Sequence, residues 1–139
     1  RGPAMSPSLL ALLGFIGWTL FLLVLMEAIR SQLVLTGAVA ANGFNPENSN
    51  LSPFMQRLAR AHANCLEGLP IFGGLLLVAM VAGKPQATDS LAFLFLAARI
   101  LQSVIHLAST SPVAVKARFT AFAVQMGIGI YWTVRLHGA

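Results

Sequence analysis

The chain contains four apolar segments, each long enough to cross a lipid bilayer as a helix. They extend over about residues 8–36, 53–82, 89–109 and 112–136, and short polar or proline-containing stretches separate them. A spanning helix needs roughly 20 predominantly apolar residues, and no strand-like alternation of period two competes with this pattern. The sequence therefore predicts an all-α fold, a transmembrane four-helix bundle with up-down-up-down topology, formed by a single domain over residues 5–139.

The low content of charged residues agrees with this prediction. Hydrophobic residues make up 57% of the 139 residues and charged residues only 9%. Soluble domains have roughly 25% charged residues, so this chain cannot cover a surface that faces water. The formal net charge of +5 is spread along the chain and forms no basic patch, which argues against nucleic acid as a partner. Membrane lipid with anionic headgroups is the expected counterpart.

Several other classes of protein are excluded at this level. Cys65 is the only cysteine, so neither an intrachain disulfide nor a cysteine metal cluster can form. No pattern typical of metal hydrolases or nucleotide-binding loops is present, and no metal is expected. The first apolar segment is too long for a signal peptide, and we expect it to be retained. Residues 1–4 look like a remainder of cloning and are left out of the fold prediction.

The helix boundaries are marked by residues that start or stop helices. Serine–proline pairs at residues 52–53 and 111–112 give an N-cap followed by proline in the first helical position. Gly37 is expected to end the first helix. Residues 83–87 are expected to form a short turn, after which Thr88 caps the third helix.

A polar stripe follows the second apolar segment. Four polar residues are spaced by three, four and three positions: Arg57, Arg60, Asn64 and Glu67. Residues with this spacing share one face of a helix. A charged residue at the centre of a spanning helix costs on the order of 3 kcal/mol on insertion scales. We therefore expect the stripe to face a partner helix or a water-filled cavity.

Polar residues of the third and fourth segments lie at similar depths. Since a helix rises about 1.5 Å per residue, Arg99, Gln102, His106 and Arg118 all fall near the midplane or in the half of the bilayer next to the first and third loops. The opposite half has no charge within its helices. His106 shares a face with Arg99, so it either lines a cavity there or packs between helices; Cys65 is expected to be a small buried residue.

Some of these charges can neutralise each other. Glu67 and Arg99 reach similar depths, which predicts a structural ion pair between the second and third helices. Glu27 and Arg30 are one turn apart and can pair in the same way. Three cations then have no acidic partner: Arg57, Arg60 and Arg118. They require lipid headgroups or an anionic ligand, and a small ligand with a carboxylate is favoured because arginine binds carboxylates bidentately.

The run RLARAHANCLEGLPIF, residues 57–72, resembles the signature of the membrane-associated proteins in eicosanoid and glutathione metabolism, the MAPEG family. In that signature an arginine is followed by an asparagine four residues later and by a glutamate three residues beyond, ahead of a proline and a phenylalanine. The resemblance extends to the Asn-Pro-Glu loop at 45–47 and to the fourth segment, where a proline-led start precedes Arg118.

The resemblance implies a homotrimer of four-helix subunits that binds glutathione between neighbouring subunits. The residues that would bind glutathione are Arg60, Asn64, Glu67, Arg99, Gln102 and His106. Among them Arg99 would brace Glu67, and Arg118 would be the catalytic residue that stabilises the glutathione thiolate. Lipophilic electrophiles would enter from the bilayer. A bacterial-type member would be an integral protein of the inner membrane, and the excess of lysine and arginine near the first and third loops puts its site toward the cytoplasm.

Departures from the family pattern leave two functional classes open. Many catalytic relatives have histidine or tyrosine at the position of Gln102 and tyrosine at the position of His106. Some members have an additional arginine at the position of Ala63. The first class is a glutathione transferase or peroxidase for hydrophobic electrophiles. The second is a membrane binding protein without turnover, similar to the family branch of the lipoxygenase-activating protein, which binds lipid or a thiol.

Overall fold

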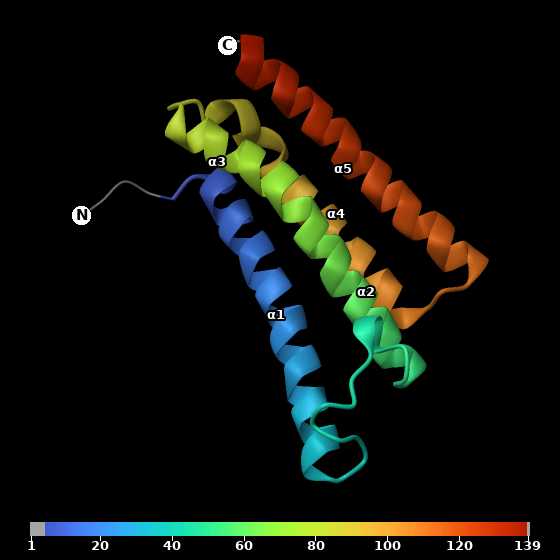
Figure 1. The fold of residues 1–139 in the computed structure, drawn as a ribbon. Helices are drawn as coiled ribbons and strands as arrows, with labels where there is room; N and C mark the ends of the chain where they lie inside the picture. The colour runs from blue at the N-terminus through green and yellow to red at the C-terminus, as the bar shows by residue number, and fades with distance from the viewer. Residues whose placement is uncertain (1–4, 139) are drawn as a thin grey trace.

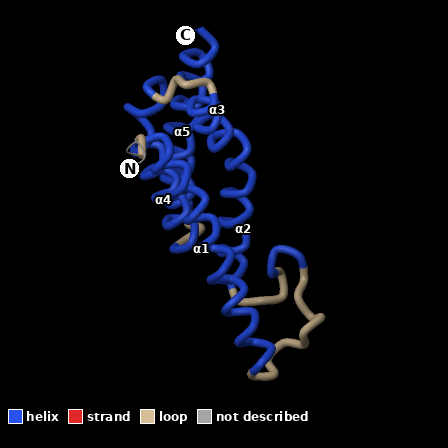
Figure 2. Tube along the Cα trace, turned by 90° about the vertical axis from the view of Figure 1, so that its left-hand side faces the viewer, coloured by secondary structure: helices blue, strands red, loops and turns tan. Residues whose placement is uncertain are grey.

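The computed structural model describes residues 5–138, which form a bundle of four long helical segments (Figure 1). The elements are α1 (Pro7–Leu35), the single-turn helix η1 (Pro46–Asn48), α2 (Pro53–Gly68), the π-helical turn η2 (Leu69–Gly73), α3 (Gly74–Val81), α4 (Gln86–Ala108) and α5 (Pro112–Gly138). Figure 2 shows only helices and loops over this range. The all-α four-helix prediction is confirmed. The presumed cloning remainder, 1–4, lies outside the described residues.

Four helical spans are long and apolar enough to cross a membrane: Pro7–Leu35, Pro53–Val81, Gln86–Ala108 and Pro112–Gly138. Large apolar side chains are exposed along all of them, including Leu20, Val81, Leu101 and Ile130. An exposed apolar surface of this extent has no favourable contact with water. It matches the hydrocarbon core of a bilayer, and the chain is an integral membrane protein.

The helix starts depend on serine hydroxyl groups. Ser52 accepts a hydrogen bond from the backbone N–H of Met55, and Ser111 accepts one from Ala114 at 3.2 Å, as predicted. The prediction that Thr88 caps the third helix is wrong, because α4 begins two residues earlier at Gln86. The Thr88 hydroxyl instead hydrogen-bonds to the Ser8 hydroxyl of α1 at 2.5 Å and lies 3.2 Å from the carbonyl oxygen of Pro85.

Gly37 and Gly83 follow the ends of two helices with φ of +77° and +71°. Both values lie in the left-handed region, where glycine has no steric penalty and closes the helix C-terminus. The predicted end of the first helix at Gly37 is confirmed, since α1 ends at Leu35 with Thr36 as its C-cap.

The second spanning segment is not a uniform α-helix. It contains one π-helical turn, Leu69–Gly73, between α2 and α3. Pro70 lies in this turn and has no backbone N–H to donate, so the regular ladder cannot pass through it. A π-turn inside a helix alters the direction of the side chains that follow, and such turns are frequent at functional sites. The apolar pattern of the sequence predicted an unbroken helix here.

Aromatic rings form the centre of the bundle. Phe95 of α4 contacts three other rings, with centroid distances of 5.4 Å to Phe15, 5.0 Å to Phe72 and 5.6 Å to Trp132. The four rings come from α1, η2, α4 and α5 and are at most 4% exposed. Aromatic pairs at these distances contribute about 0.5–1.5 kcal/mol beyond the burial of their area. They join all four helical spans at one level.

The long first loop is attached to the bundle by Asn48. Its side chain is fully buried, donates to the carbonyl oxygen of Met55 at 2.8 Å and accepts hydrogen bonds from the guanidinium group of Arg30, with 3.0 Å for the Nε donor. Arg30 also forms the predicted ion pair with Glu27, at 3.1 Å. Arg30 is thus already occupied by contacts within the fold.

Candidate functional site

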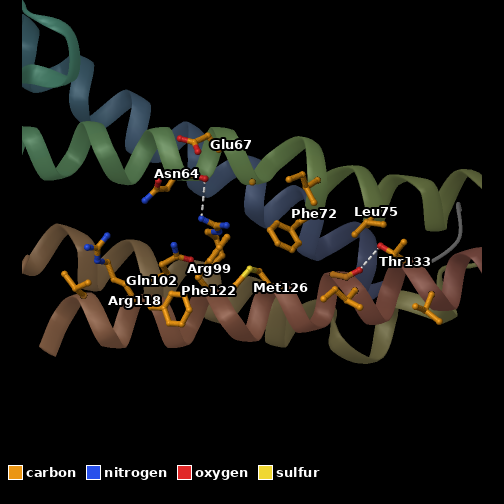
Figure 3. A pocket seen from close by; sticks show the side chains of 17 residues that line it. Asn64, Glu67, Phe72, Leu75, Arg99, Gln102, Arg118, Phe122, Met126 and Thr133 are labelled. Carbon is orange, nitrogen blue, oxygen red and sulfur yellow. Dashed lines mark hydrogen bonds between the residues drawn. The ribbon is translucent and has the colours of Figure 1, made fainter. Parts of the chain in front are cut away.

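A pocket of about 990 Å³ lies between the α2–η2–α3 segment and α5, with α4 behind it (Figure 3). One end is polar, and its lining side chains are Asn64, Glu67, Arg99, Gln102 and Arg118. The rest of the pocket is mainly apolar and is lined by residues such as Phe72, Leu75, Phe122, Met126 and Ile130. The cavity thus joins a polar end to a long apolar groove.

Five of the seven residues predicted for the site line this one pocket: Asn64, Glu67, Arg99, Gln102 and Arg118. They come from three helices that meet only in the folded chain. The other two do not line it. Arg60 is exposed on α2, and His106 is only 2% exposed and lies behind the pocket wall. The role of each residue toward a ligand stays a prediction.

Arg99 is the most buried charge of the pocket, with 1% of its surface exposed. Its guanidinium carbon lies 5.5 Å from the ring centroid of Phe15 and 5.9 Å from that of Phe122, which are cation–π distances. Its Nη1 donates to the carbonyl oxygen of Asn64 at 3.4 Å. Its Nε and Nη2 are buried without a hydrogen-bond partner among the described residues. Such donors are costly unless a ligand or water supplies an acceptor.

The predicted ion pair between Glu67 and Arg99 is wrong. Within residues 5–138 the ion pair that forms is Glu27–Arg30, whereas Glu67 is exposed and Arg99 is directed inward. Gly68 leaves room for Arg99 in this position, because a Cβ atom there would lie 2.7 Å from Arg99 Nη2 and the guanidinium group would have to shift. The guanidinium group therefore lies under the backbone of α2, away from the face that presents Glu67.

Arg118, His106 and Asn64 connect α5, α4 and α2 by hydrogen bonds. The Nδ1 atom of His106 lies 3.1 Å from Arg118 Nη1 and 3.5 Å from Asn64 Nδ2. The Nε of Arg118 is buried without a partner in the described part of the chain. Two arginines at the polar end therefore keep unpaired N–H groups.

Gln125, which forms a buried amide pair with the pocket residue Gln102, was not among the predicted site residues. Gln125 of α5 is fully buried, and its Nε2 donates to Gln102 Oε1 at 2.7 Å and to the carbonyl oxygen of Ala121 at 3.1 Å. Gln125 follows Arg118 by seven residues, a spacing that places both on one helix face. The seven-residue spacing from Arg118 could therefore have predicted that Gln125 faces the same side of α5.

Two further residues of the second span have structural roles. The Nε of Arg57 donates to the carbonyl oxygen of Leu107 at 2.8 Å, at the C-terminal end of α4. Cys65 is buried, as predicted, with its sulfur 3.4 Å from the hydroxyl oxygen of Ser103. Neither residue lines the pocket.

Comparison with known proteins gives one match. The model of the MAPEG family matches residues 8–137, nearly the whole chain. No curated protein and no solved structure matches the chain.

Proposed function

The chain belongs to the MAPEG family, and from that membership we propose that it is a membrane-embedded glutathione-binding protein that acts as a transferase or peroxidase on lipophilic electrophiles. Members of this family are glutathione-related transferases or peroxidases, or proteins without catalysis. The observation that carries the proposal is the pocket itself, whose polar end and apolar groove form one continuous cavity. A polar thiol and a lipophilic acceptor can meet in a cavity of that kind.

The charges at the polar end complement those of glutathione. The tripeptide has two carboxylates and one ammonium group. The guanidinium groups of Arg99 and Arg118 line the pocket and can donate to carboxylate or thiolate, and the exposed carboxylate of Glu67 can accept from the ammonium. Asn64 and Gln102 supply amide groups that can orient the peptide backbone.

In this proposal Arg118 is the catalytic residue. A guanidinium group beside the sulfur favours the thiolate over the thiol, and the thiolate is the nucleophile. In conjugation the thiol proton leaves to solvent, the sulfur lone pair forms a bond to the electrophilic carbon, and the leaving group or the opened ring takes the displaced electron pair. Arg118 lines the polar end of the pocket, and Phe119 and Phe122 of the same helix are among the apolar lining residues, so a thiol bound at this end can lie beside the guanidinium group and close to an apolar acceptor.

Arg60 enters the proposal only through assembly. Its side chain is exposed and lies outside the lining of the pocket within one chain. We propose the homotrimer typical of the family, in which a neighbouring subunit would cover the exposed face of α2 and Arg60 would contribute to glutathione binding there. The mass of the detergent-solubilised protein, measured by light scattering, tests this: a monomer would contradict it.

Orientation in the membrane follows from the charges. Arg57 and Arg60 lie in the first turns of α2, after the first loop, and Arg118 lies in the second turn of α5, after the third loop. By the positive-inside rule this end faces the cytoplasm, and we propose a bacterial inner membrane as the location. Labelling of single cysteines introduced into the two loop ends of intact cells would test the orientation.

The second class, a binding protein without turnover, is favoured by one observation. Most residues of the pocket are apolar, and the groove along α5 extends from Val115 to Val134. At about 1.5 Å per residue this is roughly 28 Å, enough for a long hydrocarbon chain. Such a groove can hold a lipid without any thiol chemistry.

An assay of glutathione conjugation in detergent separates the two classes. We expect the wild-type protein to conjugate glutathione to a hydrophobic electrophile and Arg118→Ala to lose most of that activity, while both bind glutathione. Saturable binding of lipid with no conjugation by the wild type would contradict the transferase and support the binding protein.

A further inference from the structure

His106 is the one predicted site residue that is buried beside the pocket and does not line it. Its ring contacts the two pocket residues Arg118 and Asn64 through a single atom, Nδ1, at 3.1 Å and 3.5 Å. It lies on α4 and therefore connects α5 with α2 at the polar end of the pocket.

The chemistry of Arg118 fixes the form of this ring. A guanidinium group has five N–H donors and no acceptor. The hydrogen bond from Arg118 Nη1 therefore requires an acceptor at His106 Nδ1. The ring is then the neutral tautomer with its proton on Nε2, since Nδ1 has no lone pair to offer when it is protonated.

We propose that His106 is a positioning residue of the reaction: as a neutral Nε2–H imidazole it accepts from Arg118 and holds that guanidinium group against the thiol of bound glutathione. The proposal rests on the proposed function for its catalytic part. It replaces the expectation that His106 binds glutathione directly, because the ring is 2% exposed and outside the pocket lining.

The hydrogen-bond inventory explains why Arg118 needs such a partner. Its Nε is buried without a partner among residues 5–138, and no ion pair forms with it in that range. The long arginine side chain loses up to about 2 kcal/mol of rotamer entropy when it is fixed. The acceptor of His106 is the side-chain contact that selects one rotamer of Arg118 before glutathione binds.

Two substitutions separate positioning from packing. His106→Leu removes the acceptor and keeps an apolar side chain, whereas His106→Asn keeps an acceptor oxygen near the position of Nδ1. We expect His106→Leu to lower kcat by about tenfold or more, as for loss of a residue that orients a reacting group. His106→Asn should retain kcat within about threefold of wild type. The dissociation constant of glutathione should change by less than about threefold in both.

A double-mutant cycle tests whether His106 acts through Arg118. In the Arg118→Ala background, His106→Leu should cause no further loss of kcat, because the guanidinium group that it orients is gone. An equal additional loss in that background would overturn the proposal. So would a weaker binding of glutathione with unchanged kcat, or a His106→Asn variant no better than His106→Leu. Thermal melting of each variant in detergent identifies any that fail to fold.

The tautomer can be measured without glutathione. Nitrogen NMR of histidine-labelled wild-type protein should show an unprotonated Nδ1 for His106, identified by the signal missing in His106→Asn, and this signal should shift in Arg118→Ala. A protonated Nδ1 near neutral pH would overturn the proposal whether or not the protein turns over. A wild type with this tautomer and no conjugation would instead refute the proposed function and leave the arrangement of His106 and Arg118 standing.

Discussion

Two buried polar clusters lie at opposite ends of the bundle, and they differ in how many of their groups are paired. The Ser8 cluster consists of Ser8, Thr88 and Asp89, where α1 and α4 begin. Asp89 Oδ1 accepts from the backbone N–H of Ser8 at 3.0 Å and from its hydroxyl at 2.6 Å. No buried side-chain atom of this cluster lacks a partner among the described residues.

The Arg118 cluster consists of Asn64, Arg99, His106 and Arg118. Here three guanidinium nitrogens are buried without a partner in the described chain: Nε and Nη2 of Arg99 and Nε of Arg118. Buried donors of this kind each cost about 1–3 kcal/mol. The polar groups of the first cluster thus join two helices, whereas the second cluster leaves three donors without a partner among the described residues, which agrees with the proposed binding of an anionic ligand. Polar residues in a membrane helix are informative about function when their hydrogen bonds are incomplete.

The largest expected effect is at the Arg118 cluster. Arg118→Ala should lower glutathione conjugation by about 100-fold or more, the usual range for loss of one donor to a developing anion. The unfolding temperature in detergent should change little. Lys116→Ala removes an exposed cation two residues earlier on α5 and should keep wild-type activity. Equal losses of conjugation activity in Arg118→Ala and Lys116→Ala would mean that the net positive charge at this end of the bundle matters and the position of Arg118 does not.

At the Ser8 cluster the loss should appear in stability and not in activity. Asp89→Ala leaves the buried hydroxyl of Ser8 with fewer partners and should destabilise the protein by about 1–3 kcal/mol. Asp89→Asn keeps the Oδ1 acceptor and should lose less. Thermal melting measures both, with conjugation per folded protein unchanged. A drop in activity without a drop in melting temperature would remove the distinction between the clusters.

Gly68→Ala sharpens the comparison without removing a polar group. The new Cβ would lie 2.7 Å from Arg99 Nη2 and would displace the guanidinium group from its position in the pocket. We expect glutathione affinity to fall by about tenfold, which corresponds to about 1.4 kcal/mol. Gly74→Ala is the matched control, since a Cβ there has no neighbour within 4 Å. Calorimetric titration with glutathione compares them, and similar affinities would show that Arg99 does not contact the ligand.

The smallest effect is expected for a contact outside both clusters. Glu27→Ala removes the ion pair with Arg30, and the side chain of Glu27 is 54% exposed. Exposed pairs contribute about 0–1 kcal/mol, and Arg30 keeps its hydrogen bonds to Asn48. The melting temperature should therefore change far less than in Asn48→Ala, which removes a buried side chain and leaves Arg30 and the carbonyl oxygen of Met55 without this hydrogen-bond partner. A large change in Glu27→Ala would show that this ion pair is more than a surface contact.

Much of the fold could be predicted because the length of each apolar segment and the serine–proline pairs at helix starts depend only on neighbouring residues in the sequence. The predicted ends of the four spans differ from those in the structure by at most three residues. The π-turn was missed because a proline in an apolar run, such as Pro70, is compatible both with a kinked helix and with a helix that tolerates the proline. The start of α4 was misplaced because Thr88 has the residue type of a cap, while its hydroxyl group bonds across to α1 instead.

The candidate site was predicted to a similar degree. Helical spacing placed Asn64 and Glu67 on one stripe, and depth along the helices placed Arg99, Gln102 and Arg118 at a similar level. The family resemblance then marked them as site residues, and all five line one pocket. Spacing along one helix could not give the direction of Arg99, which depends on the missing Cβ of Gly68 on another helix. It also could not separate His106 behind the wall from residues in it, since burial is a property of the packed helices.

Calorimetric titration of the detergent-solubilised wild-type protein with glutathione tests the central claim most directly, namely that the unpaired arginine donors of the Arg118 cluster bind an anionic thiol ligand. The account predicts saturable binding that weakens in Arg118→Ala and in Gly68→Ala but not in Gly74→Ala. No saturable binding to the wild type, or binding that is equal in all four proteins, would contradict it.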